Sequence, residues 1–536
     1  MATYLTPGVY VEEVPSTSKP IEGVSTSVAA FIGLAPGGPI NVPMRISNWT
    51  QFAKIYGDPV EPENGPFLEN AYLAHAVYGF FQNGGTLCWV VRVGPADGGP
   101  APQVALPAAG DTNLETFRVH AADGVDGPIQ IEVAEAEPPA PPPADKEEDG
   151  EKASGGDKEP QSQRERTYRI VITAGSDHEE HDGLTLKKGR SNLATKVNAA
   201  SRLIRIEETG ASLPEPQRAP AAGTYTLSAP GVSPAKVEAS DFAGDVAKRR
   251  GIGGLAAVDE ITIVAAPDFM ALAQNGDDST LRDLQTKLIA HCEGAGERMA
   301  ILDPPPDLLP QDVLDWRMNA AGYDSKFATL YYPWIEVGDP LTNRPMLVPP
   351  SGHLAGVWCR TDQTRGVHKA PANEVALGVT GLAFQVTQSE QGGLNRVGIN
   401  CIRAFPGRGI RVWGARTLSS DPEWRYINVR RLFNYVSESI MQGTQWSVFE
   451  PNDEKLWIQL RIAASNFLTR TWREGALFGA SPDQAFYVKC DAETNPPDVI
   501  EAGQVVCEIG IAPVKPAEFV VFRLSQFSDG GGEIEA

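Results

Sequence analysis

Runs of consecutive apolar residues recur along the chain and are separated by stretches with helical spacing. The apolar runs at 27–33 and 87–93 predict two buried strands, which flank a helical stretch near 66–81. Two further apolar runs, at 261–266 and 299–302, lie on either side of another helical stretch. Strands that are apolar on both faces and alternate with helices are typical of a parallel sheet covered by helices. The pattern therefore predicts an α/β domain whose strands are far apart in sequence.

The segment between 101 and 241 has a different pattern. Short alternating stretches, such as 129–133 and 168–172, predict a small β-rich insertion. Within it, five prolines in the six positions 138–143 precede a strongly charged run. Such a composition buries too little apolar surface to offset the entropy lost on ordering. We therefore predict a mobile, solvent-facing loop over about 135–166.

The last third predicts a second α/β unit. A strand at 410–416 is followed by helices at 429–441 and 453–474, with Asn452 as the expected N-cap of the long helix and Gly475 as its expected end. One face of that helix is apolar, and the opposite face must meet solvent or a partner. That opposite face carries Arg461, Ser465, Thr469 and Arg473.

Both ends of the chain predict extended β arms. The first residues combine β-branched and aromatic side chains with Pro7, Gly8 and Pro15, and the stretch 516–526 is a strong β segment before a Gly-rich acidic tail. The predicted fold is thus a multidomain α/β protein with two α/β domains, one of them interrupted by the β-rich insertion, and with extended N- and C-terminal arms. The predicted parts are an N-terminal arm (1–22), a split middle domain (23–100 plus 242–375), the insertion (101–241), a C-terminal domain (376–512) and a C-terminal arm and tail (513–536).

Composition and charge exclude several classes of protein. The formal net charge of −22 and a pI of about 4.8 disfavour binding to nucleic acid or to an anionic membrane. The start of the sequence has no apolar signal segment, and the uncharged stretch 70–91 is broken by polar residues and glycines, so we predict no membrane span. The six cysteines contain no C-x-x-C pair, which indicates small buried apolar residues and no zinc cage or disulfide framework.

Three short motifs are candidates for chemistry, and none of them predicts an active site. His178-Glu-Glu-His181 lacks the H-E-x-x-H spacing that places two imidazoles on one helical face, so a solvated loop is the better interpretation. The glycines of 251–254 and 406–409 match neither a Walker loop nor a full G-x-G-x-x-G, and turns are favoured. We predict no catalytic residue, metal site or cofactor, and no enzyme activity.

Four long motifs carry a resemblance to a known family. They are TPGVYVEE at 6–13, PPSGHLAGVWCRTDQTRGVHKAPAN at 349–373, GINCIRAFPGRGIRVWGAR at 398–416 and IGIAPVKPAEF at 509–519. In this order they resemble the contractile tail sheath proteins of phages and of related bacterial injection systems. The resemblance covers about the first hundred residues and roughly 261 to the end, and leaves out the insertion.

The resemblance implies a structural protein that forms stacked hexameric rings around an inner tube. Arms of neighbouring subunits would exchange strands between rings, and a metastable extended state would contract to drive the tube into a target envelope. The implied partners are further copies of the chain, the inner tube protein, and baseplate and terminator proteins, with no nucleic acid and no direct membrane insertion. Synthesis in the bacterial cytoplasm is expected, followed by assembly in a phage tail or a tail-like particle that is cytoplasmic or released.

Two sets of residues follow from this expectation. Arm strands that pair with a neighbour's sheet edge would place alternate side chains in pockets, although terminal strands in general pair within their own subunit. The charged side chains of the long helix are candidate contacts to the inner tube, or simply solvated helix charges. The arm residues are Tyr4, Val9, Val11, Phe519, Val521 and Phe522, and the candidate tube contacts are Lys455, Arg461, Arg470 and Arg473.

Two alternatives stay open at this point. A monomeric α/β enzyme with an unrecognised site would remain small and soluble at any concentration, whereas a sheath protein polymerises. A surface adhesin displaying the β-rich insertion would require export, which the start of the sequence does not encode. The insertion itself is hypothesised to project outward and to bind a ligand or partner.

Overall fold

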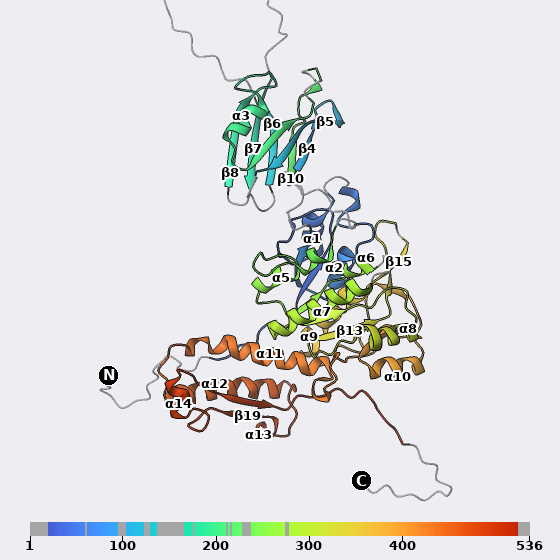
Figure 1. Ribbon diagram of the computed structural model, residues 1–536, viewed down its shortest axis with the longest axis vertical. Coiled ribbons are helices and arrows are strands. Elements are labelled where there is room, and N and C mark those ends of the chain that lie inside the picture. Colours follow the sequence, from blue (N-terminus) through green and yellow to red (C-terminus); the bar gives the residue numbers. More distant parts are fainter. Residues whose placement is uncertain are drawn as a thin grey trace, which may run out of the picture.

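The computed structural model shows an elongated molecule with three parts stacked along its long axis (Figure 1). The β-rich insertion lies at one end, a large helix-covered sheet in the middle, and a helical unit with a small sheet at the other end. The predicted loop at 135–166 and the N-terminal arm residues lie almost entirely outside the described residues. The structure describes 20–58, 62–94, 103–122, 129–136, 166–174, 177–210, 213–214, 217–227, 237–273, 278–342 and 344–523.

The middle part is built on an eight-stranded sheet. Its order is β18-β17-β13-β12-β11-β1-β3-β2, with parallel pairing from β17 to β3 and antiparallel strands at both edges. Strands β1, β11, β12 and β13 are buried at every position, as expected for a parallel sheet with both faces covered. The strands are β1 (Val28–Gly33), β2 (Met44–Ile46), β3 (Leu87–Arg92), β11 (Ile263–Ala265), β12 (Met299–Leu302), β13 (Ala328–Tyr332), β17 (Ile399–Phe405) and β18 (Gly409–Val412).

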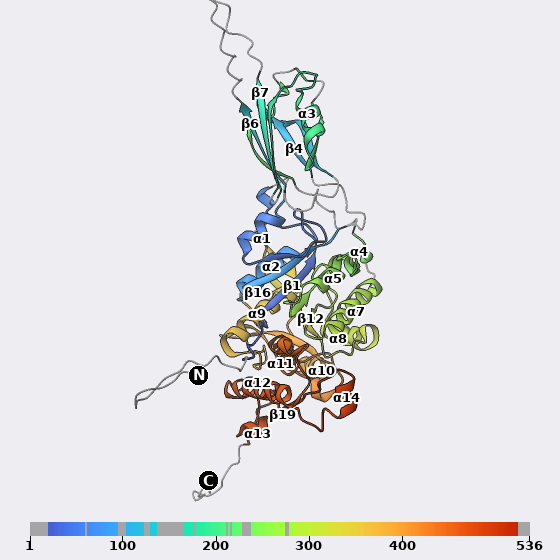
Figure 2. The ribbon, with the colours of Figure 1, turned by 90° about the vertical axis from the view of Figure 1, so that its left-hand side faces the viewer.

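Helices cover the two faces of this sheet (Figure 2). Helices α2 and α9 pack closely against each other on one face, and α7 lies on the other. The helix predicted near 66–81 begins only at Leu73, because Asn70 has the left-handed φ of 59° and interrupts any earlier turn. The helices are α1 (Trp49–Tyr56), α2 (Leu73–Gln82), α4 (Ala239–Ala243), α5 (Gly251–Gly254), α6 (Phe269–Ala273), α7 (Asp278–Ala295), α8 (Pro310–Asp315), α9 (Ser351–Arg365) and α10 (Gln388–Arg396).

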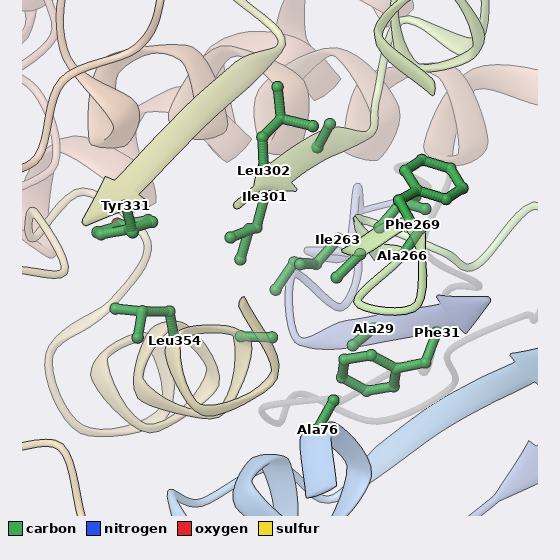
Figure 3. Close-up of a cluster of buried hydrophobic side chains, with 14 of the residues drawn as sticks. Ala29, Phe31, Ala76, Ile263, Ala266, Phe269, Ile301, Leu302, Tyr331 and Leu354 are labelled. Carbon is green, nitrogen blue, oxygen red and sulfur yellow. The ribbon is translucent and has the colours of Figure 1, made fainter. Parts of the chain in front are cut away.

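The core between α2, α9 and the sheet joins segments that are distant in sequence (Figure 3). Phe31 of β1 points toward Ala76 of α2, and Leu354 of α9 lies below Tyr331 of β13. Glycines allow the two helices to approach, since a Cβ on Gly352 would lie 2.3 Å from the Cα of Ala76. A three-stranded sheet, β15-β14-β16, flanks this core with strands Pro345–Val348, Ile335–Gly338 and Val379–Leu382.

The insertion forms two sheets around a hydrophobic core of its own. One sheet has the order β4-β5-β9, the other β10-β6-β7-β8, and α3 (Leu193–Ala200) packs at one end. The motif His178–His181 lies in strand β8 and not in a loop, because Glu180 and its neighbours pair with β7. The strands are β4 (Gln103–Ala108), β5 (Asp111–Ala121), β6 (Ile129–Ala136), β7 (Thr167–Ala174), β8 (Asp177–Leu184), β9 (Ile204–Glu208) and β10 (Gly223–Leu227).

The end opposite the insertion is formed by two long helices over a two-stranded sheet. Helix α12 is capped by Asp453, whose side chain accepts from the Leu456 N–H, so the predicted N-cap Asn452 is wrong by one residue. Strands β19 and β20 pair in antiparallel fashion. The elements are α11 (Ile427–Thr444), α12 (Glu454–Arg473), α13 (Pro482–Ala485), β19 (Phe486–Lys489), α14 (Pro497–Glu501) and β20 (Glu508–Ile511).

The predicted start of a C-terminal domain at 376 is too early. Strand β17 pairs with β13, and β18 with β17, so the strand predicted at 410–416 belongs to the main sheet. Sequence reasoning missed this because the partner of β17 is more than sixty residues away. The glycine motif at 406–409 is the predicted turn between these two strands, whereas Gly251–Gly254 forms the single-turn helix α5 and not a turn.

Candidate functional site

The chain after β20 follows the two-helix unit before it leaves the fold. The Ala512 N–H donates to the Ala485 carbonyl at 2.8 Å, and the Phe478 N–H donates to the Ala512 carbonyl at 2.8 Å. Further on, the Asn428 side chain of α11 donates to the Val514 carbonyl at 3.1 Å. Backbone contacts thus fix the C-terminal segment as far as Val514.

Glu518 is a second anchor for this segment. Its carboxylate accepts two hydrogen bonds from Arg416, at 2.6 and 2.9 Å, one from Asn395 at 2.6 Å and one from the Tyr426 hydroxyl at 3.1 Å. Burial alone would raise the pKa of Glu518, but the hydrogen bonds from Arg416 and Asn395 outweigh it, and the pKa lies below its usual value. Glu518 is therefore charged at neutral pH and ties the segment to Asn395 of α10 and to Arg416, which follows β18.

The residues directly after this anchor are apolar and exposed. Phe519, Val520, Val521 and Phe522 are 75, 70, 78 and 84% exposed. The strand predicted over 516–526 is absent from the described part, which ends at Arg523, because a strand needs a partner for its backbone groups and none lies beside it there. Sequence analysis selected three of these four residues and missed Val520.

The β19–β20 sheet has two outer edges that no other described strand covers. Within the described residues each of the two strands pairs only with the other, so the outer edge of each has unpaired backbone groups. One face of the sheet is covered, since Phe486, Val488 and Ile511 pack against the hydrophobic cluster of α11 and α12. The small sheet is therefore held in place by packing while its edges remain open.

The N-terminal arm residues Tyr4, Val9 and Val11 lie outside the described residues, but the base of that arm is defined. Ile21 is 1% exposed and packs against Gly443 of α11, where a Cβ would lie 2.8 Å from its side chain. Arg470 of α12 donates to the Ile21 carbonyl at 3.1 Å. The chain thus enters the fold on the same two helices that carry the C-terminal segment.

A buried ion pair joins this base to the main sheet. Arg431 of α11 binds Asp362 of α9 with both side chains 4% exposed, and one Arg431 nitrogen lies 2.8 Å from an Asp362 oxygen. The Thr26 hydroxyl donates to Asp362 at 2.6 Å, and Arg431 donates to the Thr26 carbonyl at 2.9 Å. The guanidinium also lies over the Trp358 ring, 4.8 Å from its centroid. Helices α9 and α11 and the N-terminal segment at Thr26 therefore meet at this ion pair.

The four charged residues selected on the long helix lie in different surroundings. Lys455, Arg470 and Arg473 are exposed, although Arg470 also donates to the Ile21 carbonyl, and Arg461 is half-buried. Sequence analysis missed Ile458 and Ile462 of α12, which are 37 and 48% exposed although both are large and apolar. The two isoleucines are four residues apart and lie outside the predicted apolar stripe, and this spacing could have identified a second apolar face of the helix from sequence.

Outside these surfaces, the buried carboxyl groups hold the backbone in place. Two buried carboxyl groups, Asp268 and Asp303, have their pKa raised to about 7 by burial, but each accepts hydrogen bonds from backbone N–H groups and so caps a chain segment. In the part of the chain that the structure describes, no group of three or more His, Cys, Asp or Glu side chains is placed to hold a metal ion. His181 and Glu179 share one face of β8, with 3.5 Å between Nε2 and Oε2.

Hydropathy adds one further finding. None of the helices within the described ranges has the length and apolar character that a bilayer crossing requires.

Comparisons with known proteins agree with the resemblance. The family model for the phage tail sheath protein central domain matches residues 250–418, and the model for the phage tail sheath C-terminal domain matches 419–527. Together the two models run without a gap over more than half of the 536 residues.

Individual relatives extend the similarity to the whole chain. The tail sheath protein of Burkholderia phage BcepMu is 24% identical over 98% of this chain and 97% of its own length. The tail sheath protein of Vibrio phage KVP40 is 30% identical, but the match spans 34% of this chain and only 27% of that protein.

A solved structure shares the fold. The sheath complex of the extracellular contractile injection system PVC, in its contracted state, matches with a TM-score of 0.56 and 21% identity over 98% of this chain and 99% of that one. The chain therefore belongs to the phage tail sheath family, the structural sheath proteins of contractile tails and injection systems.

Proposed function

We propose that this chain polymerises as stacked hexameric rings around an inner tube, and that strands exchanged between neighbouring subunits link the rings. The proposal rests on two features of the same subunit. One is the two-stranded sheet β19–β20, whose outer edges are open, and the other is the exposed apolar segment Phe519–Phe522. Each of these features is incomplete in the isolated chain, and each supplies what the other lacks.

The physical argument rests on backbone groups and apolar area. A segment added to a free sheet edge satisfies its own N–H and C=O groups and those of the edge. Burying a large apolar side chain contributes about 1.5–3 kcal/mol, so the two side chains on one face of the added strand would offset part of the cost of ordering it. The anchor at Glu518 fixes the point from which the segment leaves the fold.

The N-terminal arm takes the second open edge in this proposal. Val9 and Val11 are two residues apart and would point to one face of an added strand, whereas Tyr4, five residues before Val9, would point to the other face. Its base at Ile21 is fixed on α11 and α12.

We propose that contraction uses the same arrangement. A metastable extended assembly would relax by rotating the parts of each subunit as rigid bodies while the exchanged strands stay paired, and the free-energy difference between the two packings would drive the tube into a target envelope. No nucleotide is needed. The proposed partners are other copies of the chain, the inner tube protein, and baseplate and terminator proteins, in a phage tail or a tail-like particle assembled in the bacterial cytoplasm and retained or released.

The tube-facing surface is proposed on α12. Lys455, Arg470 and Arg473 are exposed cations there, and Ile458 and Ile462 add exposed apolar side chains between Lys455 and Arg470. Arg461 is half-buried, and the exposed Arg470 also binds the N-terminal segment at Ile21.

The insertion is proposed to project outward from the assembly. It has a separate hydrophobic core and lies at the end of the molecule farthest from α12 (Figure 1). Replacing 103–227 by a short Gly-Ser linker should leave polymerisation intact, and loss of assembly on this change would contradict an outward position.

The test of strand exchange compares two valine substitutions by negative-stain electron microscopy of the concentrated full chain. Val521→Asp places a charge on the arm, and Val246→Asp places the same charge at an exposed valine outside it. We expect tubes or stacked rings from the unchanged chain and from Val246→Asp, and shortened or absent tubes from Val521→Asp and from a chain lacking 1–15. Equal tubes from all four proteins would rule out the arms as the link.

A further inference from the structure

Two of the six cysteines stand opposite each other at the end of the β19–β20 sheet. The ladder pairs Lys489 with Glu508, and the next residues along the two strands are Cys490 and Cys507. Continuation of the same register therefore places these two cysteines directly across from each other.

The hydrogen-bond pattern of the ladder fixes the type of this pair. The Ala512 N–H donates to the carbonyl of Ala485, the residue opposite it in the same register, so this is a hydrogen-bonded pair. Hydrogen-bonded and non-hydrogen-bonded pairs alternate along an antiparallel ladder. Cys490 and Cys507 consequently form a non-hydrogen-bonded pair, for which the Cα atoms are about 4.5 Å apart. That spacing falls within the range of about 4.4–6.8 Å that a disulfide requires.

The two thiols interact. Burial, together with a smaller contribution from the neighbouring Cys490 thiol, raises the pKa of Cys507 to about 12. Burial likewise raises the pKa of Cys490, with a hydrogen bond to Cys507 acting in the opposite direction. The Arg461 guanidinium of α12 lowers the pKa of both thiols by a smaller amount.

The two thiols differ in access to solvent. Cys490 is 1% exposed within a cluster formed with Leu456, Trp457 and Leu460, whereas Cys507 is partly exposed at the edge of that cluster. A small reagent can therefore reach Cys507 first, and the thiol of Cys490 lies directly opposite.

We propose that Cys490 and Cys507 form an oxidation site, which closes to an intramolecular disulfide when the protein meets a small-molecule disulfide. The Cys507 thiolate attacks one sulfur of the reagent, the reagent's S–S bond breaks, and one thiol leaves with a proton. The Cys490 thiolate then attacks the Cys507 sulfur of the mixed disulfide, and the second reagent thiol leaves with the other proton. The reagent is reduced to two thiols, and the two cysteines are oxidised by two electrons.

The closed bond would join the start and the end of the segment that carries α14. This segment packs on the N-terminal half of α12 through Ile500 and Val505, and Asn452 donates to the Gln504 carbonyl at 2.8 Å. A cross-link here limits how far the segment can separate from α12. The proposal assigns the protein a state that depends on the redox conditions around it, reduced where it is made and oxidised where thiols are scarce.

The remaining cysteines provide an internal control. Cys88 of β3 and Cys359 of α9 are also close enough to influence each other, since burial raises the pKa of Cys88 and Cys359 raises it further. Both are 0% exposed, and they lie on a strand and a helix and not on adjacent strands of a ladder. They should stay reduced in the folded protein.

The experiment treats the full chain with oxidised glutathione under native conditions, alkylates the remaining thiols, and maps the peptides by mass spectrometry. We expect loss of two of the six thiols, a linked peptide pair containing Cys490 and Cys507, and faster reaction from pH 7 to pH 9 because more thiolate is present. Cys507→Ser should lose no thiol, and Cys490→Ser should accumulate glutathione on Cys507.

Two results would overturn the proposal. One is glutathione accumulating on Cys507 of the unchanged chain while Cys490 stays free, which would show that the sulfurs cannot meet. The other is retention of all six thiols, or equal oxidation of Cys88 and Cys359, after prolonged treatment of protein whose far-ultraviolet circular dichroism is unchanged.

Discussion

The ion pair between Arg431 and Asp362 gives the sharpest test of how the molecule is held together. Asp362→Asn keeps the size of the side chain and removes its charge, which leaves the Arg431 guanidinium buried without a carboxylate. Three segments would be affected at once, because the pair links α9, α11 and the N-terminal segment at Thr26.

The magnitude follows from the burial of the pair. Both side chains are 4% exposed, so water cannot replace the lost partner. Removing one partner of a buried pair costs about 3–5 kcal/mol, which corresponds to an increase in local opening of roughly two to more than three orders of magnitude. Thr26→Val removes one hydrogen bond to the same carboxylate and should cost only about 1 kcal/mol.

Hydrogen exchange read by mass spectrometry measures this opening directly. Peptides covering 24–27 and the first turns of α11 should exchange much faster in Asp362→Asn than in Thr26→Val, while peptides of the insertion should not change in either variant. The double variant Asp362→Leu/Arg431→Met removes both charges and should recover most of the lost protection, since replacing a whole buried pair by apolar residues is often neutral.

An equal, small change in hydrogen-exchange rate in Asp362→Asn and in Thr26→Val would contradict this prediction. That result would mean that Arg431 finds another partner or that water enters, and the pair would then not connect the three segments.

Three further predictions test other contacts. Gly352→Ala should destabilise the chain by about 1–3 kcal/mol in urea unfolding, because its Cβ would lie 2.3 Å from the Ala76 backbone, whereas Gly294→Ala on the exposed side of α7 meets nothing within 4 Å and should be neutral or stabilising. Burial, aided by His75, lowers the pKa of His353 to about 4, so the unfolded chain binds a proton at this histidine before the folded chain does as the pH falls. The free energy of unfolding should therefore drop by up to about 3 kcal/mol between pH 6.5 and 4, and His353→Gln should reduce this pH dependence. Glu518→Gln should speed hydrogen exchange at 513–518 by roughly one to two orders of magnitude, while Glu508→Gln, at an exposed glutamate, leaves it unchanged.

The sequence predicted the parallel sheet well because its strands are buried on both faces. Val28–Gly33 and Met299–Leu302 are apolar at nearly every position, and short apolar runs of this kind are typical of strands in a covered parallel sheet. It predicted the end of the domain poorly, since the pairing of β13 with β17 depends on contacts across more than sixty residues. The motif at 178–181 was misread for a related reason: charged residues on an edge strand have the composition of a loop.

The candidate surfaces were predictable only in part. Apolar residues at 519–522 are visible in sequence, but their lack of a partner is a property of the fold. Glu518 could not be recognised as an anchor, because Asn395, Arg416 and Tyr426 are about ninety or more residues away from it in sequence. The cysteines were predicted to be small apolar residues, and the facing of Cys490 and Cys507 became apparent only from strand register.

The roots of both arms lie on one pair of helices, and this sets the mechanics of any network they form. Arg470 of α12 binds the chain at Ile21, and Asn428 of α11 binds it at Val514, so the vector from one root to the other is rigid. A subunit whose two arm roots stay at a fixed distance and direction keeps its links to the same neighbours when the lattice of subunits shears. Pitch and diameter can then change together while the number of neighbours of each subunit stays constant.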